Sequence, residues 1–322
     1  MSIIEQAARR LEELRRSGIE VPERAAQAAS ARRRSAEAIP DLMARRLEDA
    51  RVTTPGALER QAPAVHEIHP PPRPGAGTKS RHVDIDLARL AAMGYLTPEK
   101  PRAQIADEFR VIKRPLLMNV LGKSAAPVDR ANLIMVTSSV PGEGKTFVTV
   151  NLAISIAAEL DKTVLLIDAD VSRPSVLSRL GLSAPRGLLD ILSDPSVELS
   201  DVLLRTNIDG LTILPAGAPR GQATELLASE GMSRLVDEMA ARYADRILLF
   251  DAPPLLPSTE SRVLATHMGQ VVVVVEAERT AQKSVMHAMA TLESCPVVMP
   301  LLNKSSRSDV GFYYGYYGPV EG

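Results

Sequence analysis

The chain of 322 residues has one cysteine, few aromatic residues and almost no net charge. Its single cysteine, Cys295, excludes an internal disulfide and suits a reducing compartment; we interpret it as a small buried apolar residue. The formal net charge of −1 gives no support for a nucleic-acid-binding surface. We therefore expect no nucleic-acid partner.

Long apolar segments are also missing from the sequence. The longest apolar runs, such as residues 271–275, are far shorter than the ~20 residues that a helix needs to span a bilayer. The N-terminus is charged from Glu5 onward and shows no apolar core of a signal peptide. The sequence therefore predicts a cytoplasmic protein that reaches a membrane only through a partner.

Composition divides the chain into four expected segments. Residues 1–52, rich in Ala, Arg and Glu, are expected to form an N-terminal helical arm, which either packs on its own domain or binds a partner. Residues 53–102 contain a proline-rich run and are expected to be a linker and docking segment. Residues 103–305 carry the patterns of one large domain, and residues 306–322 are a tyrosine-rich, flexible tail.

Aliphatic runs that alternate with helical patterns indicate a sheet within the large domain. Unbroken aliphatic runs are typical of strands that are buried on both faces. The expected strands are residues 133–138, 163–168, 211–214, 246–251, 270–276 and 296–303. The expected helices are residues 86–94, 103–114 (ended by Pro115), 145–160, 223–243, 258–267 and 280–294. This alternation predicts an α/β fold in which helices cover both faces of a mostly parallel sheet.

Residues 132–146 join a strand to a helix through a loop with two glycines. Gly142 and Gly144 allow the backbone to turn its N–H groups toward an anion, and the following helix adds its N-terminal donors. Lys145 and Thr146 stand where a phosphate loop places a lysine for the phosphates and a hydroxyl for Mg²⁺. The pattern predicts a phosphate loop, and a chance glycine turn is the alternative.

Aspartates close two of the expected strands. Asp168 and Asp170 come at the end of strand 163–168, and Asp251 ends strand 246–251. Because ligands of parallel sheets bind beyond the carboxyl ends of the strands, these carboxylates are expected beside the phosphate loop. There they suit Mg²⁺ coordination and the acceptance of a proton from a nucleophile. Solvated loop aspartates, or an aspartate that caps a helix, are the structural alternatives.

The expected helix 103–114 has an apolar face and a charged face. The charged face carries Asp107, Arg110 and Lys113 at spacings of three residues. One interpretation is an ordinary exposed, salt-bridged face. The other is a contact with a neighbouring subunit in a closed ring or array.

These motifs together resemble the bacterial tyrosine autokinases. VPGEGKT, LLIDAD and ILLFDAPP are similar to the Walker A, A′ and B motifs of that family. The family phosphorylates a tyrosine cluster at its own C-terminus, and this chain places four of its six tyrosines near its end: Tyr313, Tyr314, Tyr316 and Tyr317. The opening SIIEQAARRLEELRRSG and residues 105–117 are similar to the branch associated with exosortase and PEP-CTERM exopolysaccharide loci.

The resemblance implies a P-loop NTPase fold of the MinD/ParA-like kind and phosphoryl transfer from ATP, with Mg²⁺, to tyrosine. The residues that it implies for catalysis are Lys145, Asp168 and Asp170, with Asp170 nearest the tyrosine hydroxyl. The implied Mg²⁺ ligands are Thr146, Asp168 and Asp251. The implied nucleotide contacts are Pro141, Gly142, Glu143, Gly144, Lys145, Thr146, Phe147 and Asn303. The implied oligomerisation residues are Asp107, Arg110 and Lys113.

Partners are also implied by the resemblance. The chain looks like the split form of the family, in which a separate membrane-spanning polysaccharide chain-length determinant is the activator. The kinase would then be a homo-oligomer, peripheral to the inner membrane through that activator, and a protein tyrosine phosphatase would reverse its modification. The implied process is regulation of exopolysaccharide polymerisation and export.

Departures from the family pattern leave two other functions to weigh. Ser139 replaces the first glycine of the phosphate loop, and Ser172 stands where the family usually has an arginine. A MinD/ParA-like positioning ATPase shares the fold, but its signature lysine would stand at the position of Val140. A non-catalytic scaffold that only binds nucleotide is disfavoured, because the lysine and the three aspartates of the site are intact.

Overall fold

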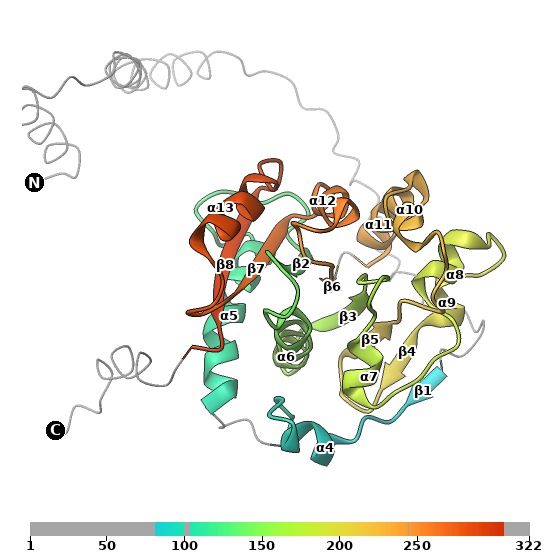
Figure 1. The fold of residues 1–322 in the computed structure, drawn as a ribbon. Helices are drawn as coiled ribbons and strands as arrows, with labels where there is room; N and C mark the ends of the chain where they lie inside the picture. The colour runs from blue at the N-terminus through green and yellow to red at the C-terminus, as the bar shows by residue number, and fades with distance from the viewer. Residues whose placement is uncertain (1–80, 100–103, 244, 306–322) are drawn as a thin grey trace, which may run out of the picture. The chain divides into compact units, whose positions relative to one another are not determined.

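The computed structural model describes residues 81–99, 104–243 and 245–305. The expected helical arm, the proline-rich part of the linker and the tyrosine-rich tail lie outside these residues, so the predictions about them stay predictions. The described residues contain one sheet and the helices that cover it (Figure 1).

The described sheet has eight strands in the order β1-β4-β5-β3-β6-β2-β7-β8. Their bounds are β1 Arg81–Val83, β2 Leu133–Ser138, β3 Thr163–Asp168, β4 Leu204–Thr206, β5 Leu211–Leu214, β6 Arg246–Asp251, β7 Gln270–Glu276 and β8 Val297–Asn303. Every neighbouring pair is parallel except β4 and β5. The predicted α/β fold with a mostly parallel sheet is confirmed.

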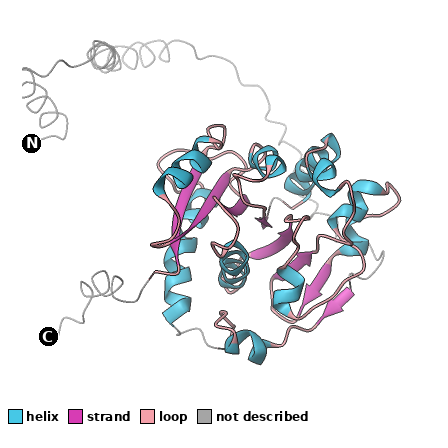
Figure 2. Cartoon of the chain, in the orientation of Figure 1, coloured by secondary structure: helices cyan, strands magenta, loops and turns pink. Residues whose placement is uncertain are grey.

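Helices cover both faces of the sheet, as Figure 2 shows by colour. On one face lie α4 Leu87–Ala92, α5 Gln104–Val120, α6 Lys145–Ala157 and α7 Val176–Leu180. On the other lie α8 Leu188–Ser193, α9 Leu199–Val202, α10 Ala223–Leu227, α11 Glu230–Arg242, α12 Thr259–Ala265 and α13 Gln282–Ala290. Successive residues of β2 alternate between the two cores, since Ile134 belongs to one and Met135 to the other. This double burial explains the unbroken aliphatic runs.

The segment from residue 81 onward belongs to the sheet domain, although the expected boundary of that domain was 103. β1 adds a strand beside β4, and two side-chain amides then hold the chain to the domain. Asn207 exchanges hydrogen bonds with the backbone of Ile85 (2.8 and 3.1 Å). The Oδ1 atom of Asn151, on α6, accepts from Leu96 N at 2.7 Å. Strands β1 and β4 have three residues each, too short to be recognised from an aliphatic run.

Helix α5 corrects two expectations. The helix does not end at Pro115 but continues through it to Val120; proline removes one N–H donor, and the packing of Leu116 and Leu117 against the core offsets that loss. Lys113 is not on an exposed face. Its side chain is buried, its Nζ donates to Ser155 O at 2.6 Å, and it pairs with Glu159 at 2.6 Å. Lys113 therefore joins α5 to α6 within the chain.

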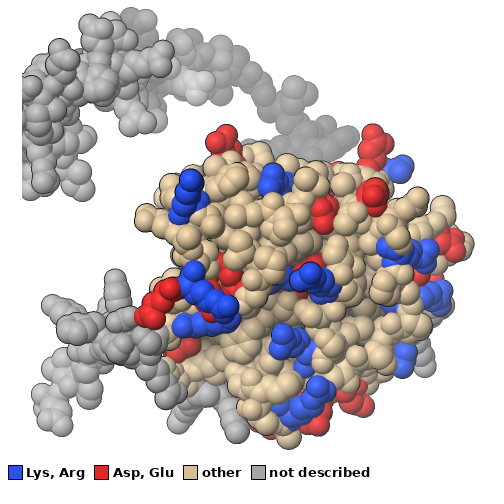
Figure 3. Space-filling model, in the orientation of Figure 1, with Lys and Arg blue, Asp and Glu red and all other residues tan. Residues whose placement is uncertain are grey.

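The surface of the described domain carries both signs of charge. On the face in Figure 3, basic and acidic side chains are interspersed over the helices and loops. Such mixing is typical of a solvated surface. Asp107 and Arg110 of α5 form an exposed ion pair with each other. In the described residues, no helix is both long enough and apolar enough to cross a bilayer.

Candidate active site

Strands β2, β3 and β6 bring the predicted site residues to one edge of the sheet. Val136 of β2 is paired with Asp251 of β6, which in turn is paired with Asp168 of β3. The phosphate loop leaves β2 beyond Ser138, at the same edge. Residues more than 100 positions apart in the chain therefore converge where ligands of parallel sheets bind.

The phosphate loop has the backbone geometry that its glycines predicted. Gly142 and Gly144 have φ values of 93° and 97°, which a residue with a Cβ adopts only with strain. A Cβ at Gly144 would also overlap the side-chain amide of Asn303. Helix α6 begins at Lys145. Among the described residues, the amide N–H groups of residues 142–146 have no protein acceptor, which is the arrangement that receives an anion.

Lys145 and Asp170 form a largely buried ion pair beside the loop. Burial alone lowers the pKa of Lys145, but the carboxylates of Asp251 and Asp170 outweigh this effect, so that its pKa lies above the ordinary value. Lys145 therefore remains a cation inside the site. Asp170 also accepts a hydrogen bond from Arg173 N at 3.3 Å, which fixes the turn after β3.

Asp251 is fully buried and is held by two threonines of α6. Its Oδ2 accepts from Thr146 Oγ1 at 2.7 Å, and its Oδ1 accepts from Thr149 Oγ1 at 3.0 Å. Burial raises the pKa of Asp251, and Lys145 and the two threonines oppose that rise. The contact with Thr146 places the predicted metal-binding hydroxyl against the predicted metal-binding carboxylate.

Asp168 presents a carboxylate oxygen without a partner. Its Oδ2 accepts from Ser175 N at 3.1 Å and from Val176 N at 3.0 Å, at the start of α7. Its Oδ1 is buried and has no hydrogen-bond partner among the described residues. Burial, and then the nearby Asp251 carboxylate, raise the pKa of Asp168 to about 8. Two buried carboxylates this close repel each other unless a cation lies near them.

These residues fit a Mg²⁺ ion that is bound together with phosphates. The described residues hold no cluster of three or more His, Cys, Asp or Glu side chains arranged as a complete metal cage. Mg²⁺ in phosphate sites uses only one or two carboxylates and completes its shell with water and substrate oxygens. The unpartnered Oδ1 of Asp168, together with Thr146 and Asp251, supplies that kind of partial donor set.

The other predicted nucleotide contacts have varied positions. Asn303 donates through Nδ2 to Glu143 O at 2.8 Å, so it does lie at the phosphate loop. Phe147 packs its ring on Tyr95, with centroids 4.9 Å apart. The side chain of Glu143 is buried and bonds to the protein rather than standing open in the loop. Pro141 lies at the outer turn of the loop, beside a cavity.

Several residues of the site were missed from the sequence. Thr149 lies one helical turn after Lys145, and that spacing could have indicated a second hydroxyl facing Asp251. Ser175, whose Oγ lies 3.0 Å from that of Thr146, follows the recognised strand-end motif by a few residues. Thr280 and Lys304 contact the loop from distant positions, and nothing in the local sequence marks them.

The predicted oligomerisation residues do not share one role. Asp107 and Arg110 pair with each other on the exposed side of α5, whereas Lys113 is occupied within the chain. The four clustered tyrosines lie outside the described residues.

Comparison with known proteins identifies relatives of the described domain. Residues 131–299 match the family model described as an AAA domain. The chain is 29% identical over 221 residues to the tyrosine-protein kinase YwqD of Bacillus subtilis, covering 68% of this chain and 89% of the relative. It is 29% identical over 251 residues to the succinoglycan biosynthesis transport protein ExoP of Rhizobium meliloti, covering 75% of this chain and 30% of the relative.

A solved structure supports the same relationship. The tyrosine kinase domain of BceF superposes with a TM-score of 0.55 at 26% sequence identity, covering 66% of this chain and 86% of that domain. The matched region contains the phosphate loop and both aspartate-bearing strands described above. The chain therefore belongs to the AAA domain family and, within it, to the bacterial tyrosine kinases, which are P-loop enzymes.

Proposed function

We propose that the protein is an ATP- and Mg²⁺-dependent autokinase that phosphorylates its own C-terminal tyrosine cluster and thereby regulates exopolysaccharide polymerisation and export. The observation that carries this proposal is the group formed by Lys145, Asp170 and the Asp168 carboxylate, whose Oδ1 has no partner among the described residues, at the phosphate loop. It combines a cation for phosphate with a carboxylate that can accept a proton. Relatives whose names include a tyrosine-protein kinase and a polysaccharide transport protein support the same function.

The geometry suggests how the residues divide the work. The N–H groups of residues 142–146 and the N-terminus of α6 bind the phosphates of ATP. Lys145 exchanges its contact with Asp170 for the transferring phosphoryl group, whose charge it stabilises. A bound Mg²⁺ would neutralise phosphate charge, and Thr146, Asp168 and Asp251 are the residues placed to hold it.

Asp170 becomes available as a proton acceptor when Lys145 turns toward the phosphates. A tyrosine oxygen then forms the new bond to the γ-phosphorus while the bond from that phosphorus to the β-γ bridging oxygen breaks. The phenolic proton moves to the Asp170 carboxylate, and ADP leaves. The buried position of Asp170 keeps water away from this transfer.

The clustered tyrosines are the proposed acceptors: Tyr313, Tyr314, Tyr316 and Tyr317. The last described strand ends at Asn303, next to the phosphate loop. Ten residues of extended chain reach ~35 Å, so a tail that starts there can enter its own site or that of a neighbour. Each phosphate adds about −1.5 to −2 charges, which would repel a modified tail from the nucleotide phosphates. Release of that tail is the proposed switch.

Assembly and localisation are part of the proposal. We propose a homo-oligomer in which Asp107 and Arg110 meet a neighbouring subunit, since both are exposed on α5. Lys113 is left out, because its side chain is buried within the chain. A membrane-spanning chain-length determinant would activate the kinase at the inner membrane, and a tyrosine phosphatase would reset it.

A positioning ATPase is the less favoured function. Val140, at the position of that class's signature lysine, is partly buried, and its N–H donates to Glu143 at 2.8 Å. No cation therefore projects from this position. A positioning ATPase would also have no use for four clustered tyrosines.

Mass spectrometry of the protein purified from its own host tests the proposal. We expect phosphate on residues 313–317 in the wild-type chain and none in Lys145→Ala. Phosphate on Tyr95 or Tyr243, with none in the cluster, would show that the tail is not the substrate. Absence of phosphotyrosine from the wild-type chain, when it is produced together with its membrane activator, would overturn the autokinase assignment.

A further inference from the structure

Glu143 lies between Gly142 and Gly144, the two glycines of the phosphate loop with positive φ angles. The residue is nevertheless buried, with only 1% of its surface exposed. A carboxylate that faced the phosphates of ATP would repel them. A carboxylate buried without partners would be costly as well. Its position in the loop therefore needs a structural explanation.

The contacts of Glu143 provide that explanation. Oε2 accepts from Val140 N at 2.8 Å, within the loop itself. Oε1 accepts from Thr280 Oγ1 at 2.5 Å, in the connection between β7 and α13, and from Glu276 N at 3.4 Å, at the end of β7. The carboxylate thus joins the first turn of the phosphate loop to a segment more than 130 residues further along the chain.

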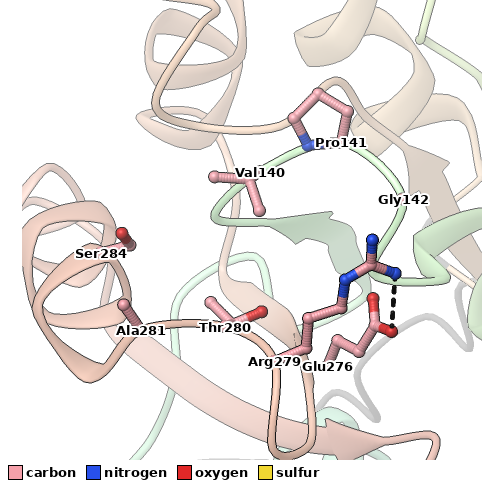
Figure 4. Close-up of a pocket in the computed structure, with 8 residues that line it drawn as sticks. All are labelled: Val140, Pro141, Gly142, Glu276, Arg279, Thr280, Ala281 and Ser284. Atoms are coloured by element: carbon pink, nitrogen blue, oxygen red, sulfur yellow. Dashed lines mark hydrogen bonds and ion pairs between the residues drawn. The ribbon is translucent and has the colours of Figure 1, made fainter.

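The connection between β7 and α13 forms the opposite wall of a cavity next to the loop. Figure 4 shows Val140, Pro141 and Gly142 on one side and Thr280 and its neighbours on the other. This cavity has a volume of about 360 Å³. Because the outer turn of the loop borders this cavity, side-chain packing supports it on fewer sides. Its shape therefore depends more on hydrogen bonds.

We propose that Glu143 is a positioning residue whose carboxylate fastens the phosphate loop to Thr280 and so holds the loop in the shape that binds nucleotide. The inference rests on the proposed function and deepens it, because it names a determinant of ATP binding. By taking the N–H of Val140, Glu143 fixes the turn from which the N–H groups of residues 142–146 project. Its side chain acts through the loop and does not touch the nucleotide.

A loop that is already ordered loses less freedom when ATP binds, so loss of the fastening should weaken binding. The ground state and the transition state use the same loop shape, and both should be affected equally. The expected signature is therefore a raised KM for ATP at nearly constant kcat. This separates Glu143 from Lys145, whose loss should lower kcat.

Three variants of the full-length protein and one control test the proposal. Thr280→Val removes only the hydroxyl donor, and the KM for ATP should rise about three- to tenfold. Glu143→Ala should raise it further, by about 30-fold or more, because every carboxylate contact is lost. Glu143→Gln should fall between these values, because an amide oxygen still accepts from Val140 N–H and its NH₂ can donate to Thr280. Ser284→Ala alters the same cavity without touching Glu143 and should change nothing.

The second readout is the Kd for a fluorescent ADP analogue with Mg²⁺, which should follow the KM values across the series. An unchanged Kd in both Thr280→Val and Glu143→Ala would overturn the proposal. So would equal losses in the Gln and Ala variants, or Kd changes that only parallel a fall in Tm without nucleotide. The titration needs no phosphoryl transfer. A wild-type chain that binds the analogue but forms no phosphotyrosine would therefore count against the proposed function and not against the role of Glu143.

Discussion

The central strands and the outer strands of the sheet contribute to the site in different ways. Strands β2, β3 and β6 lead to the groups with proposed chemical roles: β3 and β6 end at aspartates, and the loop after β2 leads to Lys145 and Thr146 at the start of α6. Strand β8 ends at Asn303, and this residue and the following Lys304 contact the backbone of the phosphate loop. In the proposed mechanism the centre supplies the reacting groups, and the outer pair fixes the shape of the phosphate loop.

This division leads to a ranking of mutational effects. Changes to the central residues should reduce the rate at saturating ATP. Changes to the residues at the ends of β7 and β8 that contact the phosphate loop should mainly raise the KM for ATP. The predictions below test that difference, beginning with the largest effect.

Lys145→Ala should reduce phosphotyrosine formation by at least ~10²-fold at saturating Mg-ATP, because one charge-stabilising donor commonly contributes that much. The fold should survive, since the side chain lies at a helix start and leaves the two cores untouched. A quantitative anti-phosphotyrosine assay measures the rate. Lys123→Ala, which changes an exposed lysine in the loop after α5, is the matched control. Near-normal activity in Lys145→Ala would contradict the central role.

Asp170→Asn should lower the single-turnover rate by ~10²- to 10⁴-fold, the usual contribution of a general base. The amide keeps the size of the side chain and still accepts from Arg173 N. Binding of a fluorescent ADP analogue should therefore stay close to the wild-type value. If turnover remained near normal, another group would have to accept the tyrosine proton.

The sequence was sufficient to predict the strands and the phosphate loop that form the central part of the site. Strands β3 and β6 were apolar runs that ended at a candidate site aspartate, so strands 163–168 and 246–251 were predicted with the bounds that the structure has. Local signals of this kind arise because burial on both faces imposes a continuous apolar pattern. The phosphate loop likewise showed its glycines and its lysine side by side.

The outer contacts could not be predicted in the same way. Thr280 meets Glu143 only because the sheet order places β7 beside β2, and no local pattern contains that order. Lys113 looked like part of an exposed charged face, but the pairing with Glu159 on the neighbouring segment draws it inside. Helix α5 continued past Pro115 because tertiary packing outweighed a local helix-breaking preference.

Asp168→Asn should separate activity from stability. The amide oxygen can still accept from Ser175 N and Val176 N, while the cost of burying a carboxyl whose pKa is raised to about 8 disappears. We expect activity to fall by at least ~10²-fold, because a donor for the bound cation is lost. Without nucleotide or Mg²⁺, Tm should rise by about 2–4 °C, equivalent to roughly 1 kcal/mol in a domain of this size. Calorimetry measures the shift, and a lower Tm would mean that the carboxylate charge is structurally required.

Asn303→Ala should raise the KM for ATP by about three- to tenfold with little change in kcat, because one partly buried hydrogen bond to the loop is lost. An initial-rate series in ATP concentration checks this expectation. A fall in kcat at constant KM would move Asn303 into the group of central residues.

Lys304→Ala should have the smallest effect of the series. Its Nζ donates to Gly142 O at 2.8 Å and pairs with Glu276 at 3.1 Å, but its side chain is 44% exposed. Exposed ion pairs contribute about 0–1 kcal/mol, so the KM for ATP should rise no more than about threefold. Salt screens such contacts, and the difference from wild type should shrink further at high ionic strength. Initial rates measured at low and high salt test both points. An effect larger than that of Asn303→Ala would show that Lys304 contacts the nucleotide itself, and the outer strands would then supply more than the shape of the loop.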